Sequence, residues 1–350
     1  MNVKIVYVEI TNRCNLNCAT CYNRSGLNKK TPELSFEKIE DIIKLFIPYG
    51  LQRFLLSGGE PTLHSEFDKI LNLIDKYPAI NFGIVTNGTN HNEILIEYLN
   101  TRKNFSLQIS LDGSNEFFNS KTRGKGNFKK TLTFAKKVNN KNHSNLLKMV
   151  VSQSNYEDVE NFCHLALSIG FTPEIAFIYN SGNGSDNWDK KSLTSQQKIK
   201  ILNLIQKINY EKNTGIFLPL CTNKCPFADE NFNELSLCIK VDGTIQPCQM
   251  IYDDEYSLGN ALKFNENLFF QQLYKISDWA KKRLETDYGC TKCITNGFCG
   301  KGCMAESINS GLSPISDDGN CEYRKQQFIN FNLKRGIFAF EKQNNTLRSE

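Results

Sequence analysis

The chain has 350 residues, 40% hydrophobic and 23% charged, which is enough to bury one large core and a smaller second domain. Its net charge of +5 includes no long run of one sign, which argues against nucleic-acid binding and suits an acidic redox partner or acidic peptide. The sequence shows no signal peptide, and no apolar run is long enough to cross a membrane. We therefore expect a cytoplasmic protein.

Short β-branched or aromatic runs alternate with longer segments of helical period along residues 4–207. This alternation predicts six strand–helix units around a parallel sheet. The predicted strands are Lys4–Ile10, Arg53–Ser57, Asn81–Thr86, Phe105–Ser110, Leu146–Val151 and Pro173–Phe177. The predicted helices are Ser35–Phe46, Glu66–Lys76, Glu93–Asn100, Phe128–Asn139, Tyr156–Ile169 and Ser195–Lys207.

Unusual residues follow the first four predicted strands. In parallel β/α sheets, ligands bind at the carboxyl ends of the strands, because the loops converge there. The residues in these loops are Cys14, Cys18 and Cys21; Gly58, Gly59, Glu60 and Pro61; Thr86 and Asn87; and Ser110 and Asp112. Each of the last three loops alone is typical of an ordinary turn. Their order at successive strand ends indicates one shared site.

The thirteen cysteines of the chain are unevenly distributed. In a reducing cytosol they indicate metal or redox chemistry in place of structural disulfides. Three lie in the loop after the first strand, Cys163 stands alone, and the remaining nine lie between Cys221 and Cys321. Cys163 falls on the apolar side of a predicted helix, so we expect a buried thiol without a function.

Cys14, Cys18 and Cys21 place three thiolates on one loop. They can ligate three irons of a cubane cluster and leave the fourth iron open to a small molecule. A structural zinc site and unliganded buried cysteines are the alternatives. Zinc would need a fourth donor, for which His64 is the candidate. The accompanying loops favour the cluster.

A second group of cysteines lies beyond about Thr214, where the strand–helix alternation stops. Its members are Cys221, Cys225, Cys238, Cys248, Cys290, Cys293, Cys299, Cys303 and Cys321. We expect metal sites, more than a hydrophobic core, to hold this region. Asp242-Gly243 between β-branched residues indicates a hairpin with a type I′ turn that fixes the position of Cys248. Taken alone, these cysteines would favour zinc.

Two further segments are notable for their pattern. Residues 180–187 are polar and rich in glycine, which indicates a loop after the sixth strand, either a linker or a lid over the substrate. A helical pattern resumes over Tyr323–Lys342.

The cysteine loop and the three loops after it resemble the radical S-adenosylmethionine (SAM) superfamily. The resemblance implies a partial (β/α)6 barrel in which Cys14, Cys18 and Cys21 hold a 4Fe-4S cluster that binds SAM. It implies that the Gly58-Gly59-Glu60-Pro61 segment contacts the methionine amino group, and that Thr86, Asn87, Ser110 and Asp112 lie near ribose and methionine. The family often has an aromatic residue beside the adenine where this chain has Thr20. Whether Tyr22 takes that role stays open.

The later cysteines are similar to the SPASM extension of radical SAM enzymes, which holds two auxiliary 4Fe-4S clusters. The resemblance implies that Cys290, Cys293, Cys299 and Cys321 hold one of them. Cys303 then joins Cys248, Cys221 and Cys225 at the other, with Cys238 as a competitor for one of the last two places. The expected domains are the barrel over 1–213, the SPASM-like region over 214–325 and a C-terminal helix over 326–350.

The resemblance implies an enzyme that cleaves SAM reductively and abstracts hydrogen from a substrate, with flavodoxin or ferredoxin as electron donor. The expected substrate is a ribosomally made peptide or protein that is cross-linked or oxidised, captured by the barrel or through a separate recognition protein. The alternatives are a dehydrogenase or epimerase of sugar-like or aminocyclitol-like molecules, a sulfatase maturase, and a non-enzymatic iron–sulfur or zinc scaffold. Against the sulfatase maturase, Gln249 follows Cys248 where those enzymes carry an aspartate base. The sequence identifies no catalytic acid or base.

Overall fold

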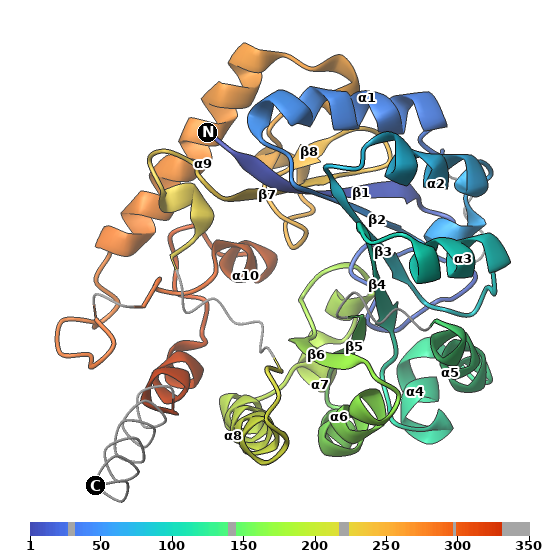
Figure 1. Ribbon diagram of the computed structural model, residues 1–350. Coiled ribbons are helices and arrows are strands. Elements are labelled where there is room, and N and C mark those ends of the chain that lie inside the picture. The colour runs from blue at the N-terminus through green and yellow to red at the C-terminus, as the bar shows by residue number, and fades with distance from the viewer. Residues whose placement is uncertain (27–31, 139–144, 217–223, 297–298, 331–350) are drawn as a thin grey trace, which may run out of the picture.

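The computed structural model describes residues 1–26, 32–138, 145–216, 224–296 and 299–330. They form an eight-stranded sheet in the order β6-β5-β4-β3-β2-β1-β7-β8, with helices along its outer face (Figure 1). All neighbouring strands are parallel except β7 and β8. The sheet has two edges, β6 and β8, as a partial barrel does.

The six predicted strands are all present and correspond to β1–β6. The strands of the sheet are β1 (Val3–Thr11), β2 (Arg53–Gly58), β3 (Asn81–Thr86), β4 (Phe105–Ser110), β5 (Leu146–Val151), β6 (Thr172–Phe177), β7 (Leu235–Ile239) and β8 (Ile245–Gln246). Because their carboxyl ends lie along one rim, the loops that follow β1 to β4 come together as expected. The prediction of a parallel β/α fold is confirmed.

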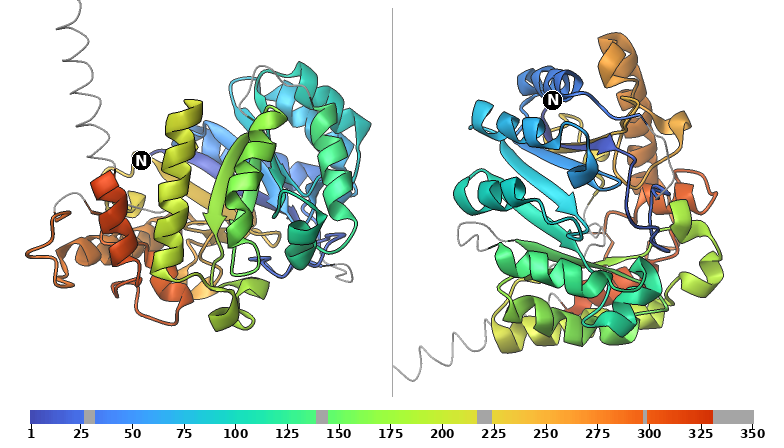
Figure 2. Two further views of the ribbon diagram at one scale, coloured as in Figure 1. Left: turned by 90° about the horizontal axis from the view of Figure 1, so that it is seen from below. Right: turned by 90° about the vertical axis from the view of Figure 1, so that its right-hand side faces the viewer.

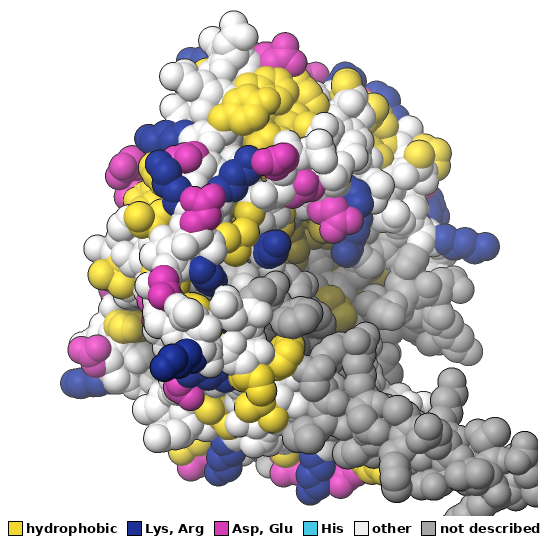
Figure 3. Space-filling view, turned by 90° about the vertical axis from the view of Figure 1, so that its left-hand side faces the viewer, with side chains coloured by type: hydrophobic (Ala, Val, Ile, Leu, Met, Phe, Trp, Pro, Cys, Tyr) yellow, Lys and Arg dark blue, Asp and Glu magenta, His cyan; other side chains and the backbone are white. Residues whose placement is uncertain are grey.

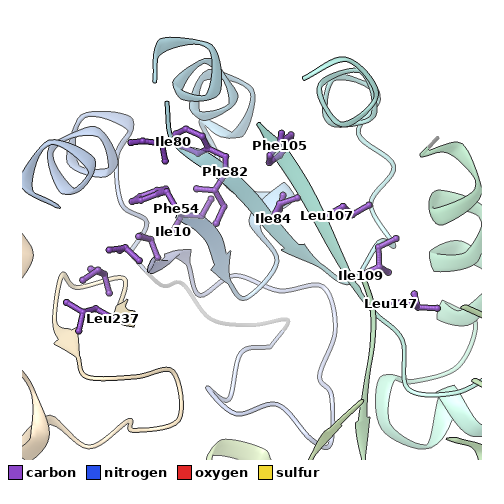
Figure 4. Close-up of a cluster of buried hydrophobic side chains, with 14 of the residues drawn as sticks. Ile10, Phe54, Ile80, Phe82, Ile84, Phe105, Leu107, Ile109, Leu147 and Leu237 are labelled. Carbon is purple, nitrogen blue, oxygen red and sulfur yellow. The ribbon is translucent and has the colours of Figure 1, made fainter. Parts of the chain in front are cut away.

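The main core lies between this sheet and the helices. Phe54, Phe82 and Phe105, from three neighbouring strands, are each at most 1% exposed and lie on the side that faces the helices (Figure 4). Burying such a side chain contributes about 1.5–3 kcal/mol. Along β1, Val8 and Ile10 join this core, so the intervening Glu9 points to the inner face of the sheet.

The predicted helices are also present, and Figure 2 shows them side by side along the outer face. They are α1 (Phe36–Phe46), α2 (Phe67–Lys76), α3 (Glu93–Thr101), α5 (Asn127–Lys137), α6 (Val159–Ser168) and α8 (Ser195–Lys212). Side-chain caps explain several starts: Ser35 accepts from the amide of Lys38, and Thr194 forms a capping box with Gln197.

Two short helices within residues 1–213 were not predicted. They are α4 (Glu116–Arg123) and α7 (Trp188–Lys191). The expectation of a single helix between β4 and β5 was wrong, because α4 begins at a cap of its own, where the Asn115 side chain accepts from the amide of Phe118. The end predicted at Asn139 lies outside the described residues; α5 ends at Lys137.

The predicted hairpin is present, but its turn and its surroundings differ from the expectation. Gly243 adopts φ +86° while Asp242 does not have a positive φ, so the turn is not type I′, which needs a positive φ at both positions. Cys238 lies opposite Gln246, two residues before Cys248. The first strand of the hairpin, β7, pairs in parallel with β1 and so extends the main sheet.

The cysteine-rich region after residue 213, here called the second region, contains more regular structure than its composition suggested. It has α9 (Glu266–Glu285) and α10 (Met304–Asn309), and α9 buries Phe269, Leu273 and Ile276 in the core. A hydrophobic core therefore shares in holding this region. The helix expected over Tyr323–Lys342 is confirmed as far as residue 330, and its remainder lies outside the described residues.

The outer surface on the α9 side carries basic and acidic side chains intermixed (Figure 3). This face therefore presents no field of one sign, in keeping with the small net charge of the chain.

A buried arginine ties the second region together. Arg283, 1% exposed, donates through Nε to the carbonyl oxygen of Lys301 at 2.9 Å and through Nη1 to that of Pro314 at 2.9 Å. The same Nη1 lies 3.1 Å from Ser307 Oγ. One side chain from α9 thus satisfies carbonyl groups on both sides of α10.

Replacing this arginine tests its importance for the second region. Arg283→Met keeps the length of the side chain but leaves buried carbonyl groups without donors, at about 1–3 kcal/mol for each group. We expect the midpoint of thermal unfolding, followed by circular dichroism, to fall by several degrees. Lys282→Met is the matched control, since Lys282 is exposed and pairs with Asp278 within its own helix. Equal midpoints for the two variants would contradict the role of Arg283.

Candidate active site at the carboxyl end of the sheet

The three predicted cluster cysteines lie in the cysteine loop, residues 12–26, directly after β1. Cys14 is 9% exposed, and Cys18 and Cys21 are half-buried. The amide of Leu16 donates to Cys14 Sγ at 3.4 Å, and the amide of Cys21 donates to the carbonyl oxygen of Cys18 at 3.2 Å. Cys14, Cys18 and Cys21 form no disulfide in the structure.

Burial disfavours the thiolate forms of Cys14 and Cys18. It raises the pKa of Cys14 to about 12 and that of Cys18 to about 11. Arg123 opposes the shift at Cys18, because its Nη1 lies 4.0 Å from Cys18 Sγ. Thiolates here need more positive charge than Arg123 provides, and metal ions would supply it. Three sulfur donors on one loop suit iron in a cluster.

His64 does not complete a zinc site. Its Nε2 lies 2.7 Å from the carbonyl oxygen of Leu34, and its Nδ1 accepts from the amide of Glu66 at 3.0 Å. Both ring nitrogens are therefore engaged. Within the described residues, no three His, Cys, Asp or Glu side chains are placed to hold one metal ion. A cubane sets a different requirement, because each thiolate bonds a different iron.

Gly58 and Gly59 pack against the backbone of the cysteine loop. A Cβ at Gly58 would lie 2.2 Å from the carbonyl oxygen of Thr11, and one at Gly59 would lie 2.2 Å from that of Arg13. The amides of Gly59 and Glu60 donate to these same oxygens at 2.6 and 2.8 Å. The two glycines therefore allow a close approach to the backbone of the cysteine loop.

Glu60 links two of the predicted loops. Its carboxylate is fully buried and accepts from Thr62 Oγ1 at 2.7 Å, from Thr86 Oγ1 at 2.6 Å and from the amide of Asn87 at 2.7 Å. Burial raises the pKa of Glu60, and these hydrogen bonds act in the opposite direction. Pro61, also buried, begins the short 3-10 turn that follows.

Asn87, which donates to Glu60, is also hydrogen-bonded to the cysteine loop. Its Nδ2 donates to Asn15 Oδ1 at 2.9 Å and lies 3.9 Å from Cys14 Sγ. Its Oδ1 accepts from Thr89 Oγ1 at 2.6 Å, and Asn15 donates to that same hydroxyl at 2.8 Å. Three of the predicted loops are therefore joined by hydrogen bonds around Cys14.

Asp112 is fully buried and pairs with a residue that the sequence analysis missed. Its Oδ2 lies 2.9 Å from Arg123 Nε and accepts from Thr122 Oγ1 at 2.8 Å, while Oδ1 accepts from the amide of Val150 at 2.9 Å. Asp112 thus holds Arg123 beside Cys18. Ser110 is half-buried at the end of β4, two residues before Asp112.

Glu9 is a second functional candidate that the sequence analysis missed. This buried carboxylate accepts from Tyr252 Oη at 2.6 Å and from Tyr22 Oη at 3.3 Å. The two tyrosine rings meet edge to face at 5.9 Å. Burial raises the pKa of Glu9. Tyr22 is therefore engaged with Glu9, and the cysteine loop is connected to the hairpin region that carries Tyr252.

Four of the later cysteines surround one small cavity of about 30 Å³. They are Cys290, Cys293, Cys299 and Cys321. Lys301 and Arg324 also line it and bring positive charge to a place where thiolates would gather. This is the set that the sequence grouped at one auxiliary cluster.

The other predicted set is only partly within the described residues. Cys225, Cys248 and Cys303 are half-buried and pack against the core. Cys248 and Cys303 lie near the buried Tyr179: burial raises the pKa of Tyr179, and the charges of the two cysteines raise it further. Cys221 lies outside the described residues. Cys238 is 2% exposed and lies opposite Tyr7 of β1, and burial raises its pKa strongly. Cys163 is fully buried in α6, as expected.

The polar loop after β6 is docked on the cysteine loop. Asn183 donates to backbone carbonyl groups of Cys18 and Cys21, and Lys191 donates to that of Ala19. This segment therefore belongs to the site. Nothing in its composition indicated that it would contact the cysteine loop.

Replacing one glycine tests the contact between the β2 end and the cysteine loop. In Gly59→Ala, the added Cβ meets the Arg13 carbonyl oxygen at 2.2 Å, so the cysteine loop has to move. We expect iron bound at this loop, measured per chain after anaerobic reconstitution, to fall at least several-fold. Gly215→Ala is the control, because its Cβ meets no atom within 4 Å. Full iron loading in both variants would show that the contact is dispensable.

Glu306 of α10 gives the structure a specific pH dependence. Burial raises its pKa to about 7, above the unfolded value, so its contribution to stability is present below about pH 4.5 and is lost as pH rises to 7. Glu306→Gln removes this loss. We expect the free energy of unfolding of the variant minus that of the parent to be about 1–2 kcal/mol larger at pH 8 than at pH 5. Urea unfolding at both values measures this, with Glu322→Gln, which removes an exposed carboxylate, as control.

The fold and the site together define a class of protein: an open parallel β/α sheet with a three-cysteine loop on its ligand-binding rim and a cysteine-lined second region. The family model described as the Radical SAM superfamily matches residues 8–166. Residues 8–166 therefore match the radical SAM superfamily, and the resemblance found in the sequence is confirmed. Proteins of this family use a 4Fe-4S cluster and SAM.

Relatives and solved structures extend the match beyond that domain. The mycofactocin maturase MftC of Mycolicibacterium smegmatis is 28% identical over 325 residues, 89% of this chain and 81% of the relative. The subtilosin biosynthesis protein AlbA of Bacillus subtilis is 26% identical over 321 residues, 86% of this chain and 67% of the relative. The structure of native anSMEcpe with bound AdoMet has a TM-score of 0.74 and 19% identity, over 95% of this chain and 98% of that chain.

Among the described residues, no helix combines the length and apolar character needed to cross a bilayer.

Proposed function

We propose that this chain is a radical SAM maturase that modifies a ribosomally synthesised peptide or protein by cross-linking or oxidation. The observation that carries the proposal is the pairing of the three-cysteine loop with a second cavity lined by four cysteines. The sequence relatives named above, a mycofactocin maturase and a bacteriocin biosynthesis protein, support a peptide as the substrate.

The same placement supports the ligand sets that we propose. We assign the SAM-binding cluster to Cys14, Cys18 and Cys21, with domains over 1–213, 214–325 and 326–350. One auxiliary cluster is assigned to Cys290, Cys293, Cys299 and Cys321, and the other to Cys303, Cys248, Cys221 and Cys225. Cys238 lies opposite Tyr7 in the sheet and near Cys248, whose charge acts on it, so it is a competitor for the place of Cys221 or Cys225. When bound, the first cluster and SAM supply a 5′-deoxyadenosyl radical that abstracts hydrogen from the substrate.

The residues of the chain prepare the place for this chemistry. Glu60 and Asn87 fix the loops around Cys14, and Asp112 orients Arg123 toward Cys18. Glu60 and Asp112 are fully buried, so we assign them mainly to positioning, with SAM contacts made by the backbone of residues 58–61 and by Ser110. Flavodoxin or ferredoxin would supply the electron, in the cytoplasm.

Two other functions remain to be distinguished from peptide modification. A small-molecule dehydrogenase or epimerase would use the same cofactors, and so would a sulfatase maturase, although Gln249 follows Cys248 in place of the aspartate base. Separate incubations of the reduced enzyme and SAM with a short Cys- or aromatic-rich precursor peptide, a sulfatase-derived peptide and a sugar alcohol decide among them. A mass change in the precursor peptide supports the proposal, and an unchanged precursor peptide alongside an altered sugar alcohol would overturn it.

Cysteine variants test the ligand assignment. Cys14→Ala removes one of three thiolates of the SAM-binding cluster, and we expect cleavage of SAM to 5′-deoxyadenosine to become undetectable. Cys293→Ala removes an auxiliary ligand, so iron falls from about twelve per chain while uncoupled SAM cleavage continues. Chromatography of 5′-deoxyadenosine and iron analysis measure both. Cys163→Ala, in the buried thiol of α6, is the control. Unchanged cleavage by the Cys14 variant would refute the assignment.

A further inference from the structure

The segment between β6 and α8 is hydrogen-bonded to the second half of the cysteine loop. Ser181 Oγ donates to the carbonyl oxygen of Tyr22 at 3.0 Å, and the amide of Asn183 donates to that of Cys21 at 2.7 Å. Asn183 Nδ2 donates to the carbonyl oxygen of Cys18 at 2.9 Å. Lys191 Nζ donates to that of Ala19 at 3.0 Å and to that of Asn183 at 2.7 Å. Four carbonyl groups of the loop thus find donors in residues 181–191, which we name the brace.

A glycine makes this close docking possible. Gly182 adopts φ +57°, and a Cβ at this position would lie 2.3 Å from the carbonyl oxygens of both Cys21 and Tyr22. A side chain is therefore excluded both by the backbone conformation and by the contact. Arg24 and Asp186 join the same two segments at the outer side, 2.8 Å apart.

The brace also brings charge to the loop. Three thiolates on one loop repel one another, and the nearby Asp112 adds a further negative charge. Arg123 lies on one side of Cys18, and Lys191 lies at Ala19, the next residue. Positive charge and hydrogen bonds near the ligands are among the features that set the reduction potential of an iron–sulfur cluster.

We propose that the brace holds the cysteine loop in its iron-binding shape, and that Lys191 is a positioning residue whose charge raises the reduction potential of the cluster bound there. The inference rests on the proposed function, because it presumes a cluster at Cys14, Cys18 and Cys21. It assigns residues 181–191 a role at the cluster, in place of a linker or a lid over the substrate.

The charge is tested on the reconstituted enzyme with Lys191→Met, Lys191→Arg and the control Lys190→Met, which alters an exposed neighbouring lysine. A redox titration followed by electron paramagnetic resonance measures the potential of the N-terminal cluster in a background in which Cys293→Ala simplifies the spectrum. We expect a more negative potential in Lys191→Met, and the parent potential in Lys191→Arg and in Lys190→Met. Equal potentials in all four proteins would overturn the role of Lys191.

The brace itself is tested by amide hydrogen exchange of the loop in the reconstituted enzyme. Asn183→Ala removes the Nδ2 hydrogen bond to Cys18, and we expect exchange at the amides of Ala19 and Cys21 to rise about fivefold, as one lost hydrogen bond predicts. Gly182→Ala should raise it further and lower the iron content by about four per chain. If Gly182→Ala does not fold, Asn183→Ala alone decides. Unchanged exchange in Asn183→Ala would overturn the brace.

The two proposals fail in different ways. If the parent carries no iron at the cysteine loop and releases no 5′-deoxyadenosine, the proposed function fails, whatever the exchange rates. If the parent cleaves SAM and the brace variants match it in potential and in exchange, only the further inference fails.

Discussion

The site depends on the contact between the end of β2 and the start of the cysteine loop. Gly58 and Gly59 allow two backbones to approach so closely that a Cβ at either glycine would overlap a carbonyl oxygen of Thr11 or Arg13. The same oxygens accept the amides of Gly59 and Glu60. Since the sheet fixes both strand ends, this contact fixes where the cysteine loop leaves β1, and the positions of the three thiols follow from it.

Buried acidic residues then arrange the loops around that contact. Glu60 joins the loops after β2 and β3, Asp112 holds Arg123 next to Cys18, and Glu9 binds Tyr22 and Tyr252. An unpaired buried carboxylate is costly, and each of these is accommodated by hydrogen bonds or by an ion pair. Their burial therefore indicates a positioning role: they set the backbone and the charges that face the thiols.

Local sequence predicted the repeating part of the fold well and the tertiary contacts poorly. The alternation of apolar residues located the strands from β1 to β6, because each lies in a sheet with a continuous core. The pairing of Arg123 with Asp112, the addition of β7 to β1 and the docking of Asn183 on Cys18 join residues far apart in the chain. Nothing in the local pattern marks such pairs. The turn at Gly243 was misjudged because the dipeptide is compatible with two geometries.

The sheet continues from the SAM-binding region into the second cysteine region. β7 pairs with β1, and Cys248 follows β8, the partner of β7, by two residues. Tyr252, four residues after Cys248, donates a hydrogen bond to Glu9 near the carboxyl end of β1. The cysteine loop and the hairpin cysteine are thus both attached to β1, one at its end and one through hydrogen-bonded neighbours. The sheet therefore sets the separation of the two cysteine regions, since a hinge at this place would have to break strand pairing.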